Sequence, residues 1–144
     1  ILAISVFTLV FLAKVFKLPS VNNSISSASA FASGSSCLFQ FIPSTWKAYG
    51  QGDVYDPQAN LAAFKRYTAD NIRQMQKAGI PINPTNIYLA HQQGIGGLKA
   101  ILKSLETGAP LPASILRNVK NNSLGGFKGL PQFYNDWDAR IKRG

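Results

Sequence analysis

Apolar residues recur at steps of three and four along most of the chain after residue 38, which is the period of a helix with one buried face. The clearest run begins at Asp56-Pro57, where the aspartate can cap a helix and the proline fits its first turn. Its periodic positions are Leu61, Phe64, Thr68, Ile72 and Met75. Because Gly79 can close the run, we expect a helix that starts at Pro57 and ends near Gly79.

The same combination of cap and proline occurs at Asn83-Pro84, ahead of the apolar stretch 87–90. Three glycines, Gly94, Gly96 and Gly97, then interrupt the pattern. It resumes with Leu98, Ile101, Leu102 and Leu105. We therefore expect two short helices that meet at a glycine turn.

Two more helices are expected near the end of the chain, one opened by Pro112 and one by Pro131. The apolar positions of the first are Ile115, Leu116 and Val119, and those of the second are Phe133, Tyr134, Trp137 and Ile141. The last helix places Asp136 and Asp138 early and its basic residues late, as the helix dipole prefers. No segment alternates with the period of a strand. The expected fold class is mainly α, a single domain of several short helices packed at steep angles.

The first 37 residues differ from the rest. Positions 1–13 are uncharged and apolar, and Lys14 and Lys17 end this run before the roughly 20 residues that a membrane-spanning helix needs. We rank a truncated signal peptide first, a short anchor that associates residues 1–16 with a membrane second, and a buried helix third. The segment 28–30 has the small-x-small shape of a signal cleavage site. We divide the chain into an apolar segment 1–17, a Ser-rich segment 18–37 and a domain 38–144.

Composition and charge limit the kinds of partner that the chain is expected to have. With 144 residues, of which 46% are apolar, the chain can bury the core of one compact domain. Fifteen Lys and Arg against six Asp and Glu give a net charge of +9, which favours anionic partners such as wall polymers, lipid headgroups or nucleic acid. The equal alternative is a basic surface that only keeps the domain soluble. One cysteine excludes an internal disulfide, and the sequence lacks a set of metal ligands, so we expect no metal and no cofactor.

Two separated motifs resemble segments of the lysozyme-like lytic transglycosylases, which cleave peptidoglycan. The first is Leu38-Phe39-Gln40-Phe41-Ile42-Pro43-Ser44-Thr45-Trp46, preceded by Cys37 where the family usually has glycine. The second is Ala90-His91-Gln92-Gln93-Gly94-Ile95-Gly96, with His91 and Gln92 in the family's tyrosine and asparagine places, a variant similar to a phage and bacterial subgroup. The resemblance runs from Leu38 to the last helix. It implies a lysozyme-like fold and an activity on MurNAc–GlcNAc bonds.

The resemblance also implies a set of sugar-contacting residues. These are Phe39, Gln40, Phe41, Tyr88, His91, Gln92 and Gly94. The amides would hydrogen-bond N-acetyl and hydroxyl groups, the rings would lie against pyranose faces, and glycine would let the backbone approach the ligand. The alternative for any one of them is a structural role, with the aromatic rings in the core and Gln40 as a satisfied interior amide.

The family's catalytic glutamate has no counterpart in this chain. Counting back from Cys37 places Asn22 near the expected acid position, and an amide has no proton to donate at neutral pH. The alternative is that residues 1–37 do not belong to the ancestral reading frame. Translating the other frames of the source DNA, and finding no Glu-Ser segment there, would remove that alternative.

Other groups offer weak substitutes for the acid. They are Asp53, Asp56, Glu106, His91 and Cys37. Asp53 lies beside a glycine in a loop, where an aspartate usually forms a turn, Asp56 is expected to cap a helix, and Glu106 is expected on the solvated surface. The histidine and the cysteine lack an activating partner in the sequence. The catalytic residues and the enzyme assignment therefore remain open.

These observations favour a peptidoglycan-directed domain whose partner is the glycan strand, with binding better supported than cleavage. We expect it in the cell envelope or periplasm, secreted, or on a virion. An active glycosidase with its acid elsewhere is one alternative. A basic helical nucleic-acid binder is another, which the scattered rather than striped Lys and Arg residues disfavour.

Overall fold

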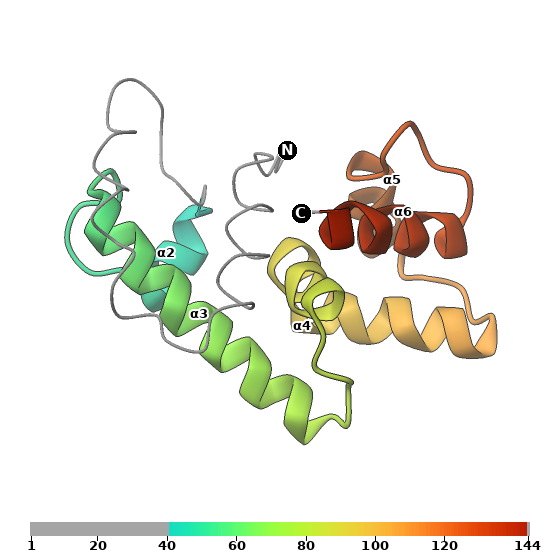
Figure 1. Cartoon of the computed structure of the whole chain (residues 1–144), viewed down its shortest axis with the longest axis horizontal. Helices are drawn as coiled ribbons and strands as arrows, with labels where there is room; N and C mark the ends of the chain where they lie inside the picture. The colour runs from blue at the N-terminus through green and yellow to red at the C-terminus, as the bar shows by residue number, and fades with distance from the viewer. Residues whose placement is uncertain (1–40, 144) are drawn as a thin grey trace. The chain divides into compact units, whose positions relative to one another are not determined.

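The computed structural model describes residues 41–143, which form five helices and no strand (Figure 1). The helices are α2 (Pro43–Tyr49), α3 (Pro57–Lys77), α4 (Pro84–Thr107), α5 (Ala113–Asn121) and α6 (Leu130–Arg143). The mainly-α prediction is confirmed. The expectations for segments 1–17 and 18–37, and for Asn22, Cys37, Phe39 and Gln40, lie outside the described residues.

The predicted caps set the starts of the two long helices. The Asp56 carboxylate accepts hydrogen bonds from the backbone N–H groups of Gln58 and Ala59 at 3.3 and 3.2 Å, at the start of α3. The Asn83 side chain accepts one from Asn86 N–H at 2.8 Å, at the start of α4. A side-chain acceptor satisfies backbone donors that have no partner in the first turn, so both helices begin where the sequence predicts.

Helix α4 bends at one of the three glycines expected to interrupt it. Gly94 has φ 74° and ψ 164°, outside the helical range, so the segments 84–93 and 95–107 are separate helical stretches joined at this residue. The prediction is wrong for Gly96 and Gly97, which lie in regular helix. Glycine is tolerated inside a helix at a cost of about 1 kcal/mol, so a cluster of glycines does not by itself show which one breaks the helix.

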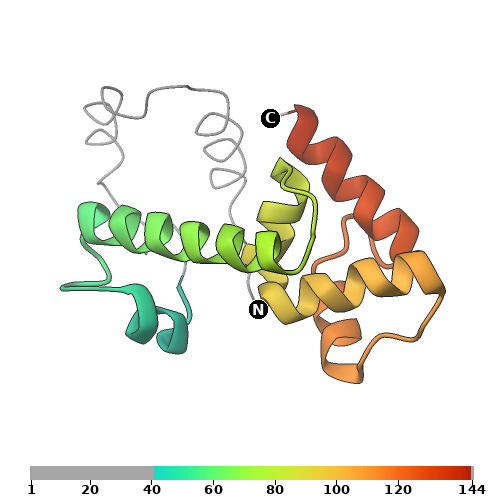
Figure 2. The same ribbon diagram turned by 90° about the horizontal axis from the view of Figure 1, so that it is seen from below.

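The described residues divide into two compact units that part within α3, one formed by residues 41–70 and the other by residues 71–143. In the unit 71–143, α4 packs against both α5 and α6 (Figure 2). The buried apolar side chains of this unit are Met75, Ile87, Tyr88, Leu89, Ala90, Leu98, Ile101, Val119, Phe133, Trp137 and Ile141. They include three of the four apolar positions predicted for the last helix. That helix has basic residues in its last turn as expected, but no acid in its first turn.

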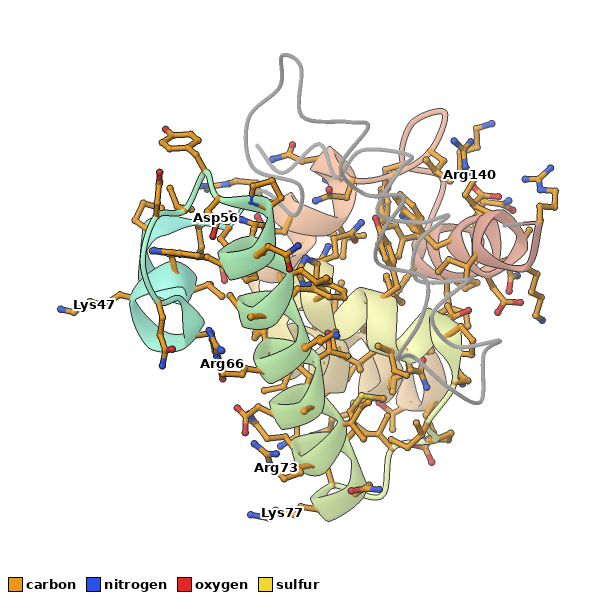
Figure 3. All side chains as sticks on the ribbon, turned by 60° about the vertical axis from the view of Figure 1, so that its left-hand side comes forward. Lys47, Asp56, Arg66, Arg73, Lys77 and Arg140 are labelled. Carbon is orange, nitrogen blue, oxygen red and sulfur yellow. The ribbon has the colours of Figure 1, made fainter. Side chains whose placement is uncertain are left out.

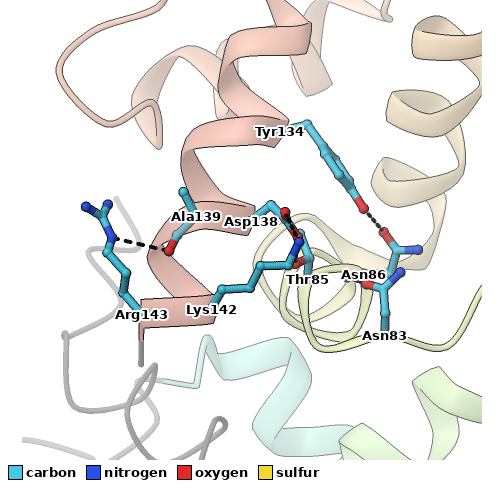
Figure 4. Close-up of polar contacts among 8 residues, drawn as sticks. All are labelled: Asn83, Thr85, Asn86, Tyr134, Asp138, Ala139, Lys142 and Arg143. Carbon is cyan, nitrogen blue, oxygen red and sulfur yellow. Dashed lines mark hydrogen bonds and ion pairs between the residues drawn. The ribbon is translucent and has the colours of Figure 1, made fainter.

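Polar side chains fasten the first half of α4 to α6 (Figure 4). Thr85 donates its hydroxyl to Asp138 at 2.7 Å, and Tyr134 donates its hydroxyl to the Asn86 side chain at 2.8 Å. Asp138 also forms an ion pair with Lys142 at 2.6 Å. Lys142 first, and then Thr85, lower the pKa of Asp138, whereas burial and the nearby Asp138 raise the pKa of Tyr134. These bonds hold the segment that leads to the Gly94 bend.

In the unit 41–70, side chains of α3 hold α2. The Arg66 side chain reaches from α3 to the end of α2, where its Nε donates to the Tyr49 carbonyl at 2.8 Å (Figure 3). The buried residues on α3 in this unit are Asn60, Leu61, Ala63 and Phe64. Asn60 donates its amide to the Val54 carbonyl at 3.1 Å and so fixes the preceding loop. Among residues 41–143, no helix combines the length and the apolar character that crossing a membrane requires.

Candidate functional site

The structure places the described site residues in both units. Phe41 belongs to the unit 41–70, whereas Tyr88, His91, Gln92 and Gly94 follow one another along α4 in the unit 71–143. The α4 residues and Phe41 are therefore described separately. The α4 residues lie in the turns that lead to the bend at Gly94, and the neighbours of Phe41 are other aromatic rings.

A chain of side-chain hydrogen bonds runs along α4 up to its bend. The side-chain amide of Gln93 donates to the side-chain oxygen Oε1 of Gln92 at 2.9 Å. The side-chain amide of Gln92 donates in turn to the Tyr88 hydroxyl at 3.4 Å. Tyr88 is fully buried and Gln92 is 6% exposed. Burial raises the pKa of Tyr88, which the hydrogen bond from Gln92 and the charge of Arg140 oppose. The tyrosine thus stays protonated and neutral.

The amide chain ends in an acceptor without a donor. The Oε1 atom of Gln93 is buried and has no hydrogen-bond partner among the described residues. Leaving a buried acceptor unsatisfied costs roughly 1–3 kcal/mol, so this oxygen favours a donor that reaches it. The Gln93 residue as a whole is partly exposed. An N–H or O–H group of a ligand is a suitable donor.

Two glycines shape the backbone at this place. Gly94 has a positive φ and an extended ψ, a combination that is essentially restricted to glycine. Gly97 is buried, and a Cβ atom there would lie 2.9 Å from the Cβ of Gln93. The bend and the missing side chain together let Gln93 fold back over the following turn. The amide chain is therefore a product of these glycines as much as of the glutamines.

His91 lies beside these amides. Its Nδ1 atom is buried, and burial lowers the pKa of His91 to about 4. The imidazole is therefore neutral at pH 7 and a weak proton acceptor. This property suits a polar wall residue better than a general base, which works best with a pKa near the operating pH.

Phe41 is part of a half-exposed aromatic cluster, formed by Phe41, Trp46, Tyr49 and Tyr67. The ring centroids of Phe41 and Trp46 are 5.7 Å apart, and those of Tyr49 and Tyr67 are 5.0 Å apart. Gly50 lies so close to the indole of Trp46 that a Cβ atom would fall 2.2 Å from it. The Tyr49 hydroxyl donates to Asp70 at 2.5 Å. Apolar ring faces beside a carboxylate are suited to a sugar ring with its hydroxyl groups.

All six carboxylates of the chain lie between residues 41 and 143, and none belongs to the buried class. Asp53 accepts from Tyr55 N–H at 2.9 Å and forms a turn, and Asp56 caps α3. Asp70 binds Tyr49, Asp136 accepts from Gln132 at 2.6 Å, and Asp138 pairs with Lys142. Glu106 is exposed near the end of α4, as expected. A carboxylic acid that stays protonated near pH 7 requires burial or a close like charge, so the arrangement does not favour a general acid.

Several residues of these clusters were not singled out from the sequence. Tyr67 and Asp70 stand three apart on α3, and this helical spacing indicates a shared face once the helix is accepted. Gln93 was part of the quoted motif without an assigned role. The contacts of Tyr49 with Tyr67 and Asp70 join α2 to α3, and α2 was not predicted, although Pro43 in its first turn is a signal that could have indicated it.

Within residues 41–143, no group of three or more His, Cys, Asp or Glu side chains could hold a metal ion. Comparison with known proteins gives no match to a family model, to a curated protein or to a solved structure. What the chain does is therefore inferred from its own residues.

Proposed function

We propose that this chain is a peptidoglycan-directed domain of the lysozyme-like, lytic transglycosylase type, which binds glycan strands without cleaving them. The observation that carries the proposal is the chain of amides at the α4 bend, Gln93 to Gln92 to Tyr88, which ends in a buried oxygen without a donor. Glycan strands of amino sugars present N–H and O–H donors. Placing the protein in the cell envelope, in the secreted fraction or on a virion follows from this choice of partner.

The aromatic cluster gives independent support. Its four rings are half-exposed, and Tyr55 in the same unit is 70% exposed. A monomeric domain gains nothing in stability from leaving ring faces in water, whereas a carbohydrate ligand covers such faces with its C–H groups. Two of its four rings, Phe41 and Trp46, belong to the motif 38–46 that resembles the family.

Binding without cleavage agrees with the positions of the carboxylates. Cleavage by this family's scheme needs one carboxyl group that donates a proton to the leaving oxygen and then accepts one. The chain has no buried carboxylate, and five of its six acids form a turn, a cap, a hydrogen bond or an ion pair. An active glycosidase that uses one of these acids is the alternative within the same fold.

Cosedimentation with purified peptidoglycan sacculi tests the binding. The wild-type chain should pellet with the sacculi. Replacing Gln93 by leucine should weaken binding about two- to tenfold, because the one hydrogen bond that its Oε1 atom accepts from the ligand, worth about 0.5–1.5 kcal/mol, is lost. Gln132→Leu on α6 is the matched control, since Gln132 is exposed and far along the chain from the bend. Wild-type protein that remains in the supernatant, with a helical circular dichroism spectrum, would overturn the proposal.

A basic nucleic-acid-binding domain is the second candidate, and the excess of positive charge in the unit 71–143 favours it. Residues 71–143 contain ten Lys and Arg against three acids, a net charge of +7. Such a surface gives salt-sensitive affinity for phosphates. Binding to duplex DNA that persists near physiological salt would support this candidate, and binding that disappears well below it would exclude it.

A further inference from the structure

A shallow pocket of about 330 Å³ lies in the unit 71–143, and none of its lining residues belongs to the amide chain. It is formed by the turn that ends α3 and by the second half of α4. Its lining residues are Ala78, Gly79, Ile80, Pro81, Lys99, Leu102, Lys103 and Glu106. Only Glu106 was considered from the sequence, as a weak substitute for the acid, and it was expected on the solvated surface. The volume falls at the lower end of the range of small-molecule sites.

The turn supplies an apolar wall and no free backbone donors. Gly79 has φ 67°, its N–H donates to the Gln76 carbonyl at 3.2 Å, and Ile80 N–H donates to the Met75 carbonyl at 3.0 Å. This is the hydrogen-bond pattern of a Schellman motif, in which a glycine ends the helix. Because both N–H groups are used, polar recognition in the pocket depends on side chains.

Three charged side chains supply that recognition. Lys99 and Lys103 are exposed and stand four residues apart on α4, and Glu106 follows three residues later. Lys99 and Lys103 repel each other at this spacing and Glu106 opposes the helix dipole, whereas Lys103 and Glu106, three residues apart, attract each other. No ion pair among these three residues occurs in the described part of the chain. Their charges remain available to a ligand.

We propose that this pocket binds a short peptide that carries both a free carboxylate and a free amino group. The ligand carboxylate lies between Lys99 and Lys103, and the ligand amino group lies against Glu106. An apolar side chain of the ligand packs on Ile80 and Leu102. Charge complementarity indicates the class of ligand. Two cationic side chains and one anionic side chain beside an apolar wall match a zwitterion with an aliphatic side chain. This proposal does not depend on glycan binding.

Titration of the ¹⁵N-labelled chain with the dipeptide Ala-Leu, followed by nuclear magnetic resonance, tests the proposal. The amide signals of Gly79 and Leu102 should shift and saturate. Acetylating the amino group or amidating the carboxylate of the dipeptide should weaken binding about three- to fivefold each, as expected for partly exposed ion pairs. Absence of saturable shifts at these two amides, or equal affinity for the doubly blocked dipeptide, would overturn the proposal.

Matched variants test which charged side chain of the pocket contacts which end of the dipeptide. Lys99→Gln combined with Lys103→Gln should weaken the free dipeptide and leave the amidated one unaffected. Glu106→Gln should weaken the free dipeptide and leave the acetylated one unaffected. Lys120→Gln, at an exposed position outside the pocket, is the control and should change nothing. All four positions are exposed, so the variants should keep the wild-type fold and spectrum. Pocket variants that bind like the control would contradict the assignment.

Discussion

The units formed by residues 41–70 and 71–143 contain one tryptophan each, and the two side chains have different surroundings. Trp137 is 6% exposed, lies 4.9 Å from the Tyr88 ring and donates its N–H to the Asn122 carbonyl at 2.9 Å. Trp46 is half-exposed and contacts Phe41 and Gly50. Trp137 thus helps to hold the helices of its unit together, whereas the ring of Trp46 is partly open to solvent.

The units also differ in charge. Residues 41–70 contain three basic and three acidic residues, a net charge of zero, against the net +7 of residues 71–143. Almost all of the chain's +9 therefore lies in the second unit. This difference separates two kinds of recognition. The aromatic cluster lies in the unit without net charge, whereas the amide chain lies in the basic unit.

Truncating each tryptophan should give the largest contrast. Trp137→Ala should lower the free energy of unfolding by about 3–5 kcal/mol, because a buried aromatic ring and its hydrogen bond are lost. Trp46→Ala should cost about 1 kcal/mol, since its ring is already half in water. Urea unfolding followed by circular dichroism measures both values. Equal losses would break the distinction between a structural and a surface tryptophan.

Acid should weaken the unit that contains His91. Its pKa is about 4 in the folded chain and about 6.5 when unfolded, so the unfolded state takes up the proton first. The free energy of unfolding should be unaffected by protonation of His91 above pH 6.5, and it should decline by about 3 kcal/mol in total as the pH falls toward 4. His91→Gln should remove this decline. Unfolding free energies measured between pH 7 and pH 4 that fall equally in both proteins would contradict the burial of the imidazole.

The α4 bend gives a contrast between neighbouring glycines. Gly94→Ala should destabilise the chain by about 1–3 kcal/mol, because its backbone conformation is unfavourable for any residue with a Cβ. Gly96→Ala is the control. It lies in regular helix with open space around it and should stabilise by up to about 1 kcal/mol. Thermal unfolding separates the two, and a stabilising Gly94→Ala would show that the bend is not fixed by this residue.

Asp138 should have the smallest effect of these. Lys142 and Thr85 lower its pKa, so its contribution to stability is present above the carboxylate's unfolded pKa and is lost as the pH falls through the lower folded value. Asp138→Asn should flatten the stability profile below about pH 4, where His91 is already protonated. If the unfolding free energy of this variant falls below pH 4 as it does in the wild-type chain, solvent screens the ion pair of Asp138 and Lys142 completely.

Local chemistry made much of the helical structure predictable. Asp56 and Asn83 each act within three residues of their own position, and Gly79 ends α3 through its own φ angle. The burial of Phe133, Trp137 and Ile141 follows from a helical period in which one face lies against α4. Such signals are carried by neighbouring residues and need no knowledge of distant contacts.

The site was less predictable, because its properties depend on tertiary packing. The motif residue Tyr88 is entirely buried against Trp137, which stands 49 positions later, and no local pattern distinguishes this role from ligand contact. The aromatic cluster depends on α2, a helix of seven residues whose first turn has no side-chain cap of the kind that marks α3 and α4 in the sequence. The sequence singled out Tyr88 and Gln92, but it indicated neither the hydrogen bond between them nor the role of Gln93.

Incubation of the purified chain with peptidoglycan sacculi, with analysis of both pellet and supernatant, tests binding without cleavage in one sample. The pellet should contain the protein, and mass spectrometry of the supernatant should detect no anhydro-muropeptides above a protein-free control. Release of anhydro-muropeptides by the wild-type chain would contradict the proposal of binding without cleavage.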